Sequence, residues 1–194
     1  MLCTSIFHNS NKRMKNVIVI AEEGDIIGEK KLIGLYLQGE MVDNQWHATD
    51  GSVWDILVTG VGALNVMWSL RDMPRDTRLL NIGYAGSANF EIGSLVEATE
   101  VRLNHPCVKY PEPEMHLMPV DAALLQEPDN VLHAMCYSNT DFVLQSDYTD
   151  CVFDMELAFM AGMGFTRLSA LKIVSDNLSL HKYRQVAAEG KTPK

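Results

Sequence analysis

Short apolar runs recur along the chain and predict strands of a buried sheet. These runs are rich in valine, isoleucine and leucine and carry few charges, which is typical of parallel strands covered on both faces. The clearest of them span residues 17–20, 54–59, 78–82 and 168–174. Residues 95–103 and 131–137 predict further strands, the first with apolar and charged side chains on opposite faces.

Patterns between the strands predict helices and one irregular loop. Residues 155–163 are apolar almost all round and predict a buried helix that contains Glu156. Residues 180–188 predict a last helix. Residues 26–49 fit either a short helix or a hairpin, whereas residues 104–119 contain four prolines and predict an irregular loop.

Small residues follow two of the predicted strands. Gly60 and Gly62 precede a helical pattern that runs through Leu70, so strand, turn and helix indicate a βα unit. Residues 83–86, with the sequence GYAG, predict a second turn of small residues. Glycines let a ligand approach the backbone, and a helix N-terminus favours anions. Asn65 stands where a dinucleotide-binding motif has its third glycine, so no dinucleotide cofactor is expected.

Two acidic residues interrupt apolar segments in the C-terminal half. Glu156 lies inside the predicted helix, and Asp176 follows the strand at 168–174, at the edge where open α/β sheets bind ligands. Local structure offers another explanation, with Asp154 as a helix N-cap, Glu156 as a first-turn acid and Asp176 in a strand-ending turn. Burying an unpaired carboxylate costs several kcal/mol, so two in one apolar unit indicate a partner or a task.

The composition limits the classes of function. The 194 residues suffice for one domain, and we expect residues 15–194 to form it after a flexible tail at residues 1–14. Sixteen lysines and arginines against 25 acidic residues give a net charge of −9, which opposes nucleic-acid binding. A membrane protein is not expected, since no apolar run approaches the ~20 residues that a spanning helix needs.

The cysteines and histidines show no spacing typical of a metal site or a disulfide framework. The six histidines form no HExxH motif or Cys/His cluster, and the cysteines are Cys3, Cys107, Cys136 and Cys151. Reduced thiols in a cytoplasmic protein without a metal or cofactor are therefore expected.

The order of the motifs resembles one known family. The acidic turn AEEGD after the first strand, followed by GVG, NIGYAG, SNTDFV, FDMELA and VSDN, is similar to the nucleoside phosphorylase and nucleosidase family, the type that includes purine and uridine phosphorylases. The similarity is greatest to the nucleosidases that cleave methylthioadenosine and adenosylhomocysteine. The resemblance spans about residues 15–183 and implies a three-layer α/β/α sandwich around a central mixed, twisted sheet. It also implies a homodimer or larger oligomer.

The resemblance implies roles for the acids. Glu156, with Met155 before it, matches a Met-Glu pair whose carboxylate holds the ribose hydroxyls. Asp176 matches the acid that protonates the purine as it leaves. The water-activating acid falls by spacing on Asp25, and its nearby substitutes are Glu22 and Glu23.

The resemblance also implies substrate-binding residues. Phe142 and Val143 match the position that stacks on the base. Tyr84 stands where the family usually has a small residue. The other substrate contacts that we expect come from Gly62, Tyr84, Ala85, Gly86 and Ser175.

Two departures from the family's phosphorylases favour water as the nucleophile. Those enzymes are expected to hold phosphate with two arginines, and Gly28 and Asn81 stand at these positions here. We therefore expect hydrolysis of the N-ribosidic bond of a purine nucleoside or thio-nucleoside, a reaction that builds positive charge on the sugar. A phosphate-dependent phosphorylase and a non-catalytic nucleoside-binding paralogue are the alternatives.

Overall fold

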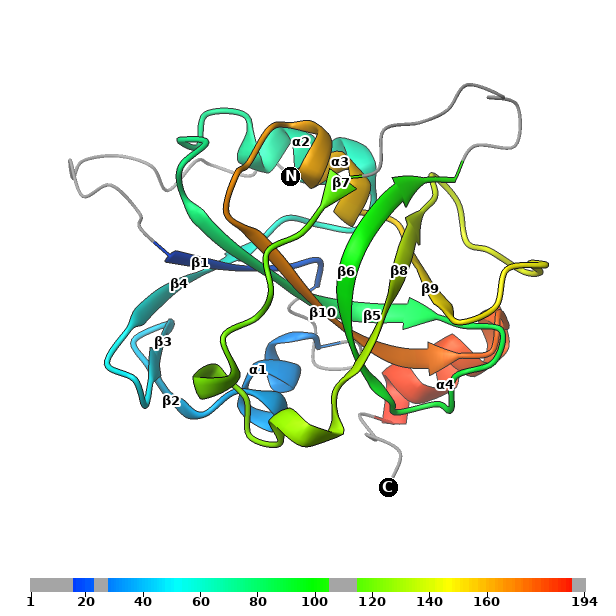
Figure 1. The fold of residues 1–194 in the computed structure, drawn as a ribbon, viewed down its shortest axis with the longest axis horizontal. Coiled ribbons are helices and arrows are strands. Elements are labelled where there is room, and N and C mark those ends of the chain that lie inside the picture. The colour runs from blue at the N-terminus through cyan, green and yellow to red at the C-terminus, as the bar shows by residue number, and fades with distance from the viewer. Residues whose placement is uncertain (1–15, 23–27, 105–114, 190–194) are drawn as a thin grey trace.

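The computed structural model describes residues 16–22, 28–104 and 115–189 (Figure 1). Its strands are β1 (Asn16–Ile20), β2 (Gly39–Val42), β3 (Gln45–Ala48), β4 (Val53–Val58), β5 (Arg78–Gly86), β6 (Leu95–Leu103), β7 (Met115–His116), β8 (Leu132–Ser138), β9 (Cys151–Asp154) and β10 (Leu168–Asp176). Its helices are α1 (Lys30–Tyr36), α2 (Ala63–Leu70), α3 (Leu157–Gly162) and α4 (Leu180–Glu189), with the 3₁₀ turns η1 (Ala122–Leu124) and η2 (Pro128–Asn130). None of the helices in these ranges is long and apolar enough to cross a membrane.

Five strands of the mixed sheet close into a ring. β10 pairs in parallel with β5 and antiparallel with β6, and the ring continues through β8 and β9 back to β5. From β5 the sheet extends outward through β1, β4, β3 and β2. The register shifts between Val174 and Asp176 in β10 and between Ala98 and Glu100 in β6. Such bulges bend strands and increase their twist, which helps neighbouring strands to curl into a ring.

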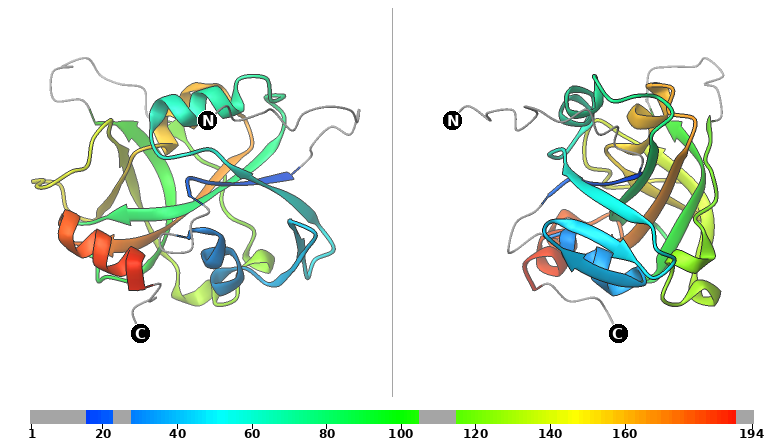
Figure 2. Two further views of the ribbon diagram at one scale, coloured as in Figure 1. Left: turned by 180° about the vertical axis from the view of Figure 1, so that it is seen from behind. Right: turned by 90° about the vertical axis from the view of Figure 1, so that its left-hand side faces the viewer.

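Helices cover both faces of the sheet around β1. Val17 and Val19 pack in one core with α2 and α3, whereas the alternate residues Ile18 and Ile20 pack in a second core with α1. Figures 1 and 2 show α2 and α3 together on one side of the sheet and α1 on the other. α4 lies beside the ends of β5 and β10 (Figures 1 and 2).

The mixed sheet flanked by helices confirms the broad fold expected from the sequence, and the closed ring is an addition to it. Every residue of β10 is buried, as its continuous apolar run predicts. The ambiguous segment at 26–49 contains both alternatives, because α1 is followed by the hairpin of β2 and β3. Asp43 and Asn44 form the hairpin turn with φ of 47° and 64°, the positive values that two-residue turns require.

Two expectations of local structure are wrong. Residues 83–86 do not turn but continue β5, where pairing with β10 satisfies their backbone groups in an extended conformation. The helix expected over residues 155–163 begins only at Leu157, because β9 pairs with β8 up to Asp154. Glu156 is therefore the N-cap of α3 and does not lie inside the helix. Nor is α3 buried all round, since Gly162 is exposed.

Candidate active site

A pocket with a volume of about 120 Å³ lies at the carboxyl ends of β1, β5, β9 and β10. Its described lining contains five carboxylic acids and no lysine, arginine or histidine. The acids are Glu29, Asp141, Asp154, Glu156 and Asp176. A cleft lined by one sign of charge concentrates the field inside it, so this pocket favours a ligand that carries or develops positive charge.

Asp176 is the last residue of β10 and is fully buried. The register shift against β5 occurs at Ser175, whose hydroxyl donates to Asp176 Oδ2 over 2.8 Å. The backbone N–H of Ser179 donates to Oδ1 over 3.0 Å. Burial raises the pKa of Asp176, although these donors lower it. A raised pKa favours the protonated form, which can donate a proton.

Glu156 faces the pocket from the start of α3. The backbone N–H of Gly62, in the turn after β4, donates to Glu156 Oε1 over 2.6 Å, and that of Met155 donates to Oε2 over 3.2 Å. Burial and then the Asp154 carboxylate raise the pKa of Glu156 to about 7, although the Lys172 ammonium lowers it. Glu156 therefore changes its charge near neutral pH.

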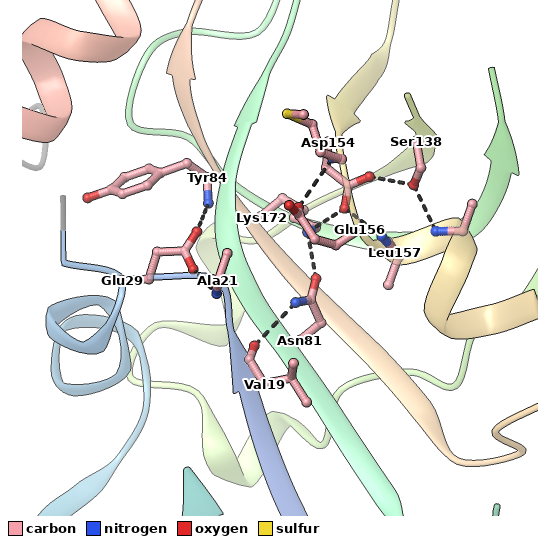
Figure 3. Close-up of polar contacts among 12 residues, drawn as sticks. Val19, Ala21, Glu29, Asn81, Tyr84, Ser138, Asp154, Glu156, Leu157 and Lys172 are labelled. Atoms are coloured by element: carbon pink, nitrogen blue, oxygen red, sulfur yellow. Dashed lines mark hydrogen bonds and ion pairs between the residues drawn. The ribbon is translucent and has the colours of Figure 1, made fainter. Parts of the chain in front are cut away.

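Glu29 is a third buried carboxylate and precedes α1 (Figure 3). Its Oε2 accepts from the N–H groups of Ala21, over 2.5 Å, and of Glu22, over 3.3 Å. Its Oε1 accepts from Tyr84 N–H over 3.1 Å. A Cβ at Gly83 would lie 2.7 Å from Oε1, so β5 reaches the carboxylate because residue 83 is glycine. Burial raises the pKa of Glu29 against the effect of these donors.

A buried lysine stands behind the pocket wall. The ammonium group of Lys172 lies 2.6 Å from Asp154 Oδ2 and donates to Asn81 Oδ1 over 2.5 Å. The Asn81 amide in turn donates to the carbonyl of Val19 over 3.2 Å. Burial alone would lower the pKa of Lys172, but Asp154, Cys136 and Glu156 together more than offset this and hold it above its usual range. Figure 3 shows this pair next to Glu156.

Aromatic rings form another part of the wall. The centroids of Phe142 and Tyr183 lie 5.6 Å apart, and Tyr183 meets Tyr84 edge to face at 6.4 Å. Val143 and Met155 add apolar surface to the same pocket. Rings at such spacings can pack against a planar heterocycle.

Solved structures with a similar fold include 5′-methylthioadenosine/S-adenosylhomocysteine nucleosidases (MTANs). The MTAN from Chlamydia trachomatis bound to MTA matches with a TM-score of 0.65 at 17% identity, over 91% of this chain and 90% of that one. This chain has the MTAN fold. The MTAN from Colwellia psychrerythraea in complex with adenine matches with a TM-score of 0.64 at 18% identity, over 93% and 90%. The enzyme from S. pneumoniae with the transition-state inhibitor MT-ImmA gives 0.63 at 17% identity, over 90% and 92%. No protein-family model and no curated protein matches the sequence.

Within this MTAN fold, most of the residues that the sequence suggested for the site meet at one pocket. Gly62 reaches it through its hydrogen bond to Glu156. Glu23 and Asp25 lie outside the described residues, so their roles stay predictions. The predicted residues that line the pocket directly are Tyr84, Ala85, Gly86, Phe142, Val143, Met155, Glu156, Ser175 and Asp176.

Asp154 has a structural role and also faces the pocket. Its Oδ2 accepts from Leu157 N–H over 3.0 Å, so it caps α3 as the local alternative predicts. The same side chain lines the pocket and pairs with Lys172.

Other residues of the site were not expected from the sequence, among them Glu29, Lys172 and Tyr183. Glu29 precedes Leu32 and Ile33, both buried, and this spacing marks it as an acid at the start of a helix. Lys172 is the single charge in the apolar run at 168–174. Tyr183 lies in a polar helical pattern, where nothing in the sequence distinguishes it.

Replacing Gly83 with alanine should destabilise the protein through Glu29. The added methyl group would displace the Glu29 carboxylate from Tyr84 N–H and leave buried polar groups unpaired, so Gly83→Ala should lower the free energy of unfolding by about 1–3 kcal/mol. Denaturant unfolding measures this. The control is Gly34→Ala in α1, where a Cβ meets open space and should stabilise the protein by about 0.5–1 kcal/mol. Equal stability of Gly83→Ala and wild type would contradict the contact.

Glu156 should make stability depend on pH. Because its folded-state pKa of about 7 lies above the usual 4.5, its protonated form stabilises the fold. This contribution is complete below pH 4.5 and is lost as pH rises through about 7, on the order of 3 kcal/mol in all. Glu156→Gln keeps a neutral side chain of similar shape and should remove this part of the pH dependence. Unfolding curves of both proteins from about pH 4 to pH 8 test it, and identical slopes would assign the titration elsewhere.

Proposed function

We propose that the chain is a nucleosidase that hydrolyses the N-ribosidic bond of a purine nucleoside or thio-nucleoside, of the methylthioadenosine or adenosylhomocysteine type, in the cytoplasm. The observation that carries the proposal is the convergence of Glu29, Glu156 and Asp176 on one pocket beside the ring of Phe142. The ligands of the structural neighbours, MTA and adenine, support the same substrate class.

The base leaves at the end of the pocket where Asp176 lies. As the bond between sugar carbon and ring nitrogen breaks, its electron pair goes to the base, and protonated Asp176 gives its proton to the base. The raised pKa of Asp176 supports this role, because the acid must hold a proton before the bond breaks. Phe142 and Val143 supply apolar surface for the planar ring.

The sugar is held by Glu156. An ionised carboxylate that accepts hydrogen bonds from two ribose hydroxyls fixes the ring and offsets the positive charge that develops on it. The hydrogen bond from Gly62 N–H keeps one oxygen of Glu156 in place. This role requires the ionised form, so activity should fall as pH drops below about 7.

The water is activated by Glu29. Its three hydrogen bonds come from backbone N–H groups, which hold the carboxylate at the junction of β1 and β5 without using a side-chain partner. The water adds to the sugar carbon and gives its proton to Glu29, while Asp176 becomes a carboxylate. Free base and free sugar leave, and the two acids exchange protons with solvent. Glu29 lines the pocket and Glu22 does not, so among the described residues Glu29 is the alternative to Asp25 and its substitutes Glu22 and Glu23.

Water is favoured over phosphate by the charge of the pocket. Five carboxylic acids and no basic residue form its described lining. Asn81, at the position where a phosphorylase is expected to carry an arginine, is buried and bonded to Val19 and Lys172. A phosphate ion would meet negative charge and no bidentate donor.

Incubation with a panel of purine nucleosides and thio-nucleosides should release free base and free sugar without phosphate. Asp176→Asn, Glu156→Gln and Glu29→Gln should each lower kcat/KM, by about 10²- to 10⁴-fold for the proton-transfer residues Asp176 and Glu29. Asp25→Asn and Glu23→Gln serve as matched comparisons for Glu29→Gln, since among these three acids only the one that activates the water should show the large loss. Chromatography of base and reducing sugar provides the measurement.

Three results would contradict the proposal. Release that strictly needs phosphate and yields ribose 1-phosphate would establish a phosphorylase. Nucleosides that raise the melting temperature but are never cleaved would establish a binding protein. Near wild-type rates in both Asp176→Asn and Glu156→Gln would show that these acids serve only as turn and cap residues.

We also propose that the nucleosidase is a homodimer formed through α2. Three apolar side chains project from this helix, Leu64 (83% exposed), Trp68 (70%) and Met67 (44%). Beside them lies a groove of about 360 Å³ between α2 and α3, whose lining includes three methionines, Met67, Met115 and Met163. Contiguous apolar surface of this kind marks an interaction site, and a second copy can cover it symmetrically.

Trp68→Glu should therefore dissociate the dimer. A carboxylate in place of the indole would have to be buried without a partner in the apolar interface, which is strongly unfavourable. Sedimentation or light scattering should report half the wild-type mass. Met41→Glu, at a partly exposed apolar position on β2 far from α2, should keep the wild-type mass (Figure 1). A monomeric wild type, or a dimer in both variants, would exclude this interface.

A further inference from the structure

Lys172 and Asp154 form an ion pair inside the apolar core. Their side chains are 1% and 0% exposed. On β10, Lys172 stands between Ala170 and Val174, both part of the main core. Taking two charges out of water costs several kcal/mol, and an apolar pair of similar volume would avoid that cost. A pair kept in this place, directly behind the pocket, indicates a role in the site.

The pair holds the first turn of α3. Asp154 Oδ2, which contacts Lys172, also accepts from Leu157 N–H over 3.0 Å. The Ser138 hydroxyl donates to Asp154 Oδ1 and accepts from Ala158 N–H over 2.8 Å. Two of the N–H groups that a helix leaves unpaired at its N-terminus are thus satisfied by side chains at the ends of β8 and β9.

This external cap leaves Glu156 free for another task. An N-cap residue usually uses its side chain to accept from the first turn of its own helix. Glu156 occupies the N-cap position of α3 but makes no such bond. Its carboxylate points instead to Gly62 N–H and into the pocket.

We propose that the Lys172–Asp154 pair is the positioning element for Glu156. The pair fixes the start of α3 so that the carboxylate faces the sugar. Its cation favours the ionised form of that carboxylate, and its anion favours the protonated form. The assignment of a sugar to this carboxylate rests on the proposed nucleosidase function. The geometry of the pair, the cap and the carboxylate stands independently of it.

The groups that face Glu156 act on it in opposite directions. Besides burial, the Asp154 carboxylate on β9 raises the pKa of Glu156, and Glu29, ahead of α1, does so more weakly. The Lys172 ammonium on β10 lowers it. Two further titratable neighbours stay neutral because burial raises their pKa, namely Cys136 on β8 and Tyr183 on α4.

Two single variants with opposite outcomes test the proposal. Lys172→Met removes the cation and should move the acid limb of the kcat/KM profile to higher pH by about one pH unit, a tenfold change in the ratio of ionised to protonated Glu156. Asp154→Asn removes the negative charge and should move the same limb to lower pH. The double variant should return the limb toward the wild-type position. Asp72→Asn, which breaks the exposed pair with Arg71, should leave the profile unchanged.

A titration by carbon-13 NMR gives the same answer without turnover. The Glu156 carboxyl resonance is identified by its loss in Glu156→Gln, and its midpoint should rise in Lys172→Met and fall in Asp154→Asn. If wild type cleaves no nucleoside, the proposed function fails while this titration still decides the role of the pair. If Lys172→Met does not fold, Asp154→Asn and the double variant carry the test. Reduced activity with an unmoved Glu156 midpoint in every folded variant would overturn the proposal.

Discussion

The pairing of β5 with β10 is the contact on which the site depends. It closes the ring and sets residues 83–86 beside the end of β10, with Gly86 opposite Asp176. A Cβ at Gly86 would lie 3.1 Å from Asp176 Oδ1, and one at Gly83 would lie 2.7 Å from Glu29 Oε1. β5 therefore packs closely against two proposed catalytic carboxylates, against Glu29 at Gly83 and against Asp176 at Gly86. A slip of one residue would turn β10 over and remove Asp176 from the pocket.

Burial of several acids in one place imposes a second constraint, because they cannot all be charged. The proposed reaction needs Asp176 protonated and Glu156 ionised, and their surroundings differ accordingly. The donors to Asp176 are neutral groups of Ser175, Leu178 and Ser179. Glu156, in contrast, lies close enough to Lys172 for the ammonium to lower its pKa. A base bound against Asp176 would exclude more water and raise its pKa further, while the cationic sugar would favour ionised Glu156. Bound substrate would thus increase the difference in protonation between Asp176 and Glu156 that the fold already favours.

The sequence was informative wherever the signal was local. Apolar runs marked β1, β4, β5, β6, β8 and β10, and charges that interrupt apolar segments marked Glu156 and Asp176. The turn predicted at residues 83–86 was wrong because small residues occur both in turns and in strands that pack closely against a side chain. Glu29 was missed because its bonds to Ala21 and Tyr84 depend on how the chain returns after β1. Counting along the chain cannot measure that return. The water-activating role that it gives to Asp25 stays a prediction.

Lys172 extends the argument against phosphate beyond the missing arginines. It is the cation that lowers the pKa of both Glu29 and Glu156, yet its side chain is turned to Asp154 and Asn81 and does not line the pocket. A phosphate ion entering the pocket would find that charge already paired and would face the carboxylates alone. At an effective dielectric constant of about 20, each charged carboxylate about 4 Å away would repel a unit negative charge by ~4 kcal/mol. Water carries no charge, so in the proposed hydrolysis the same acids can orient it and accept its proton.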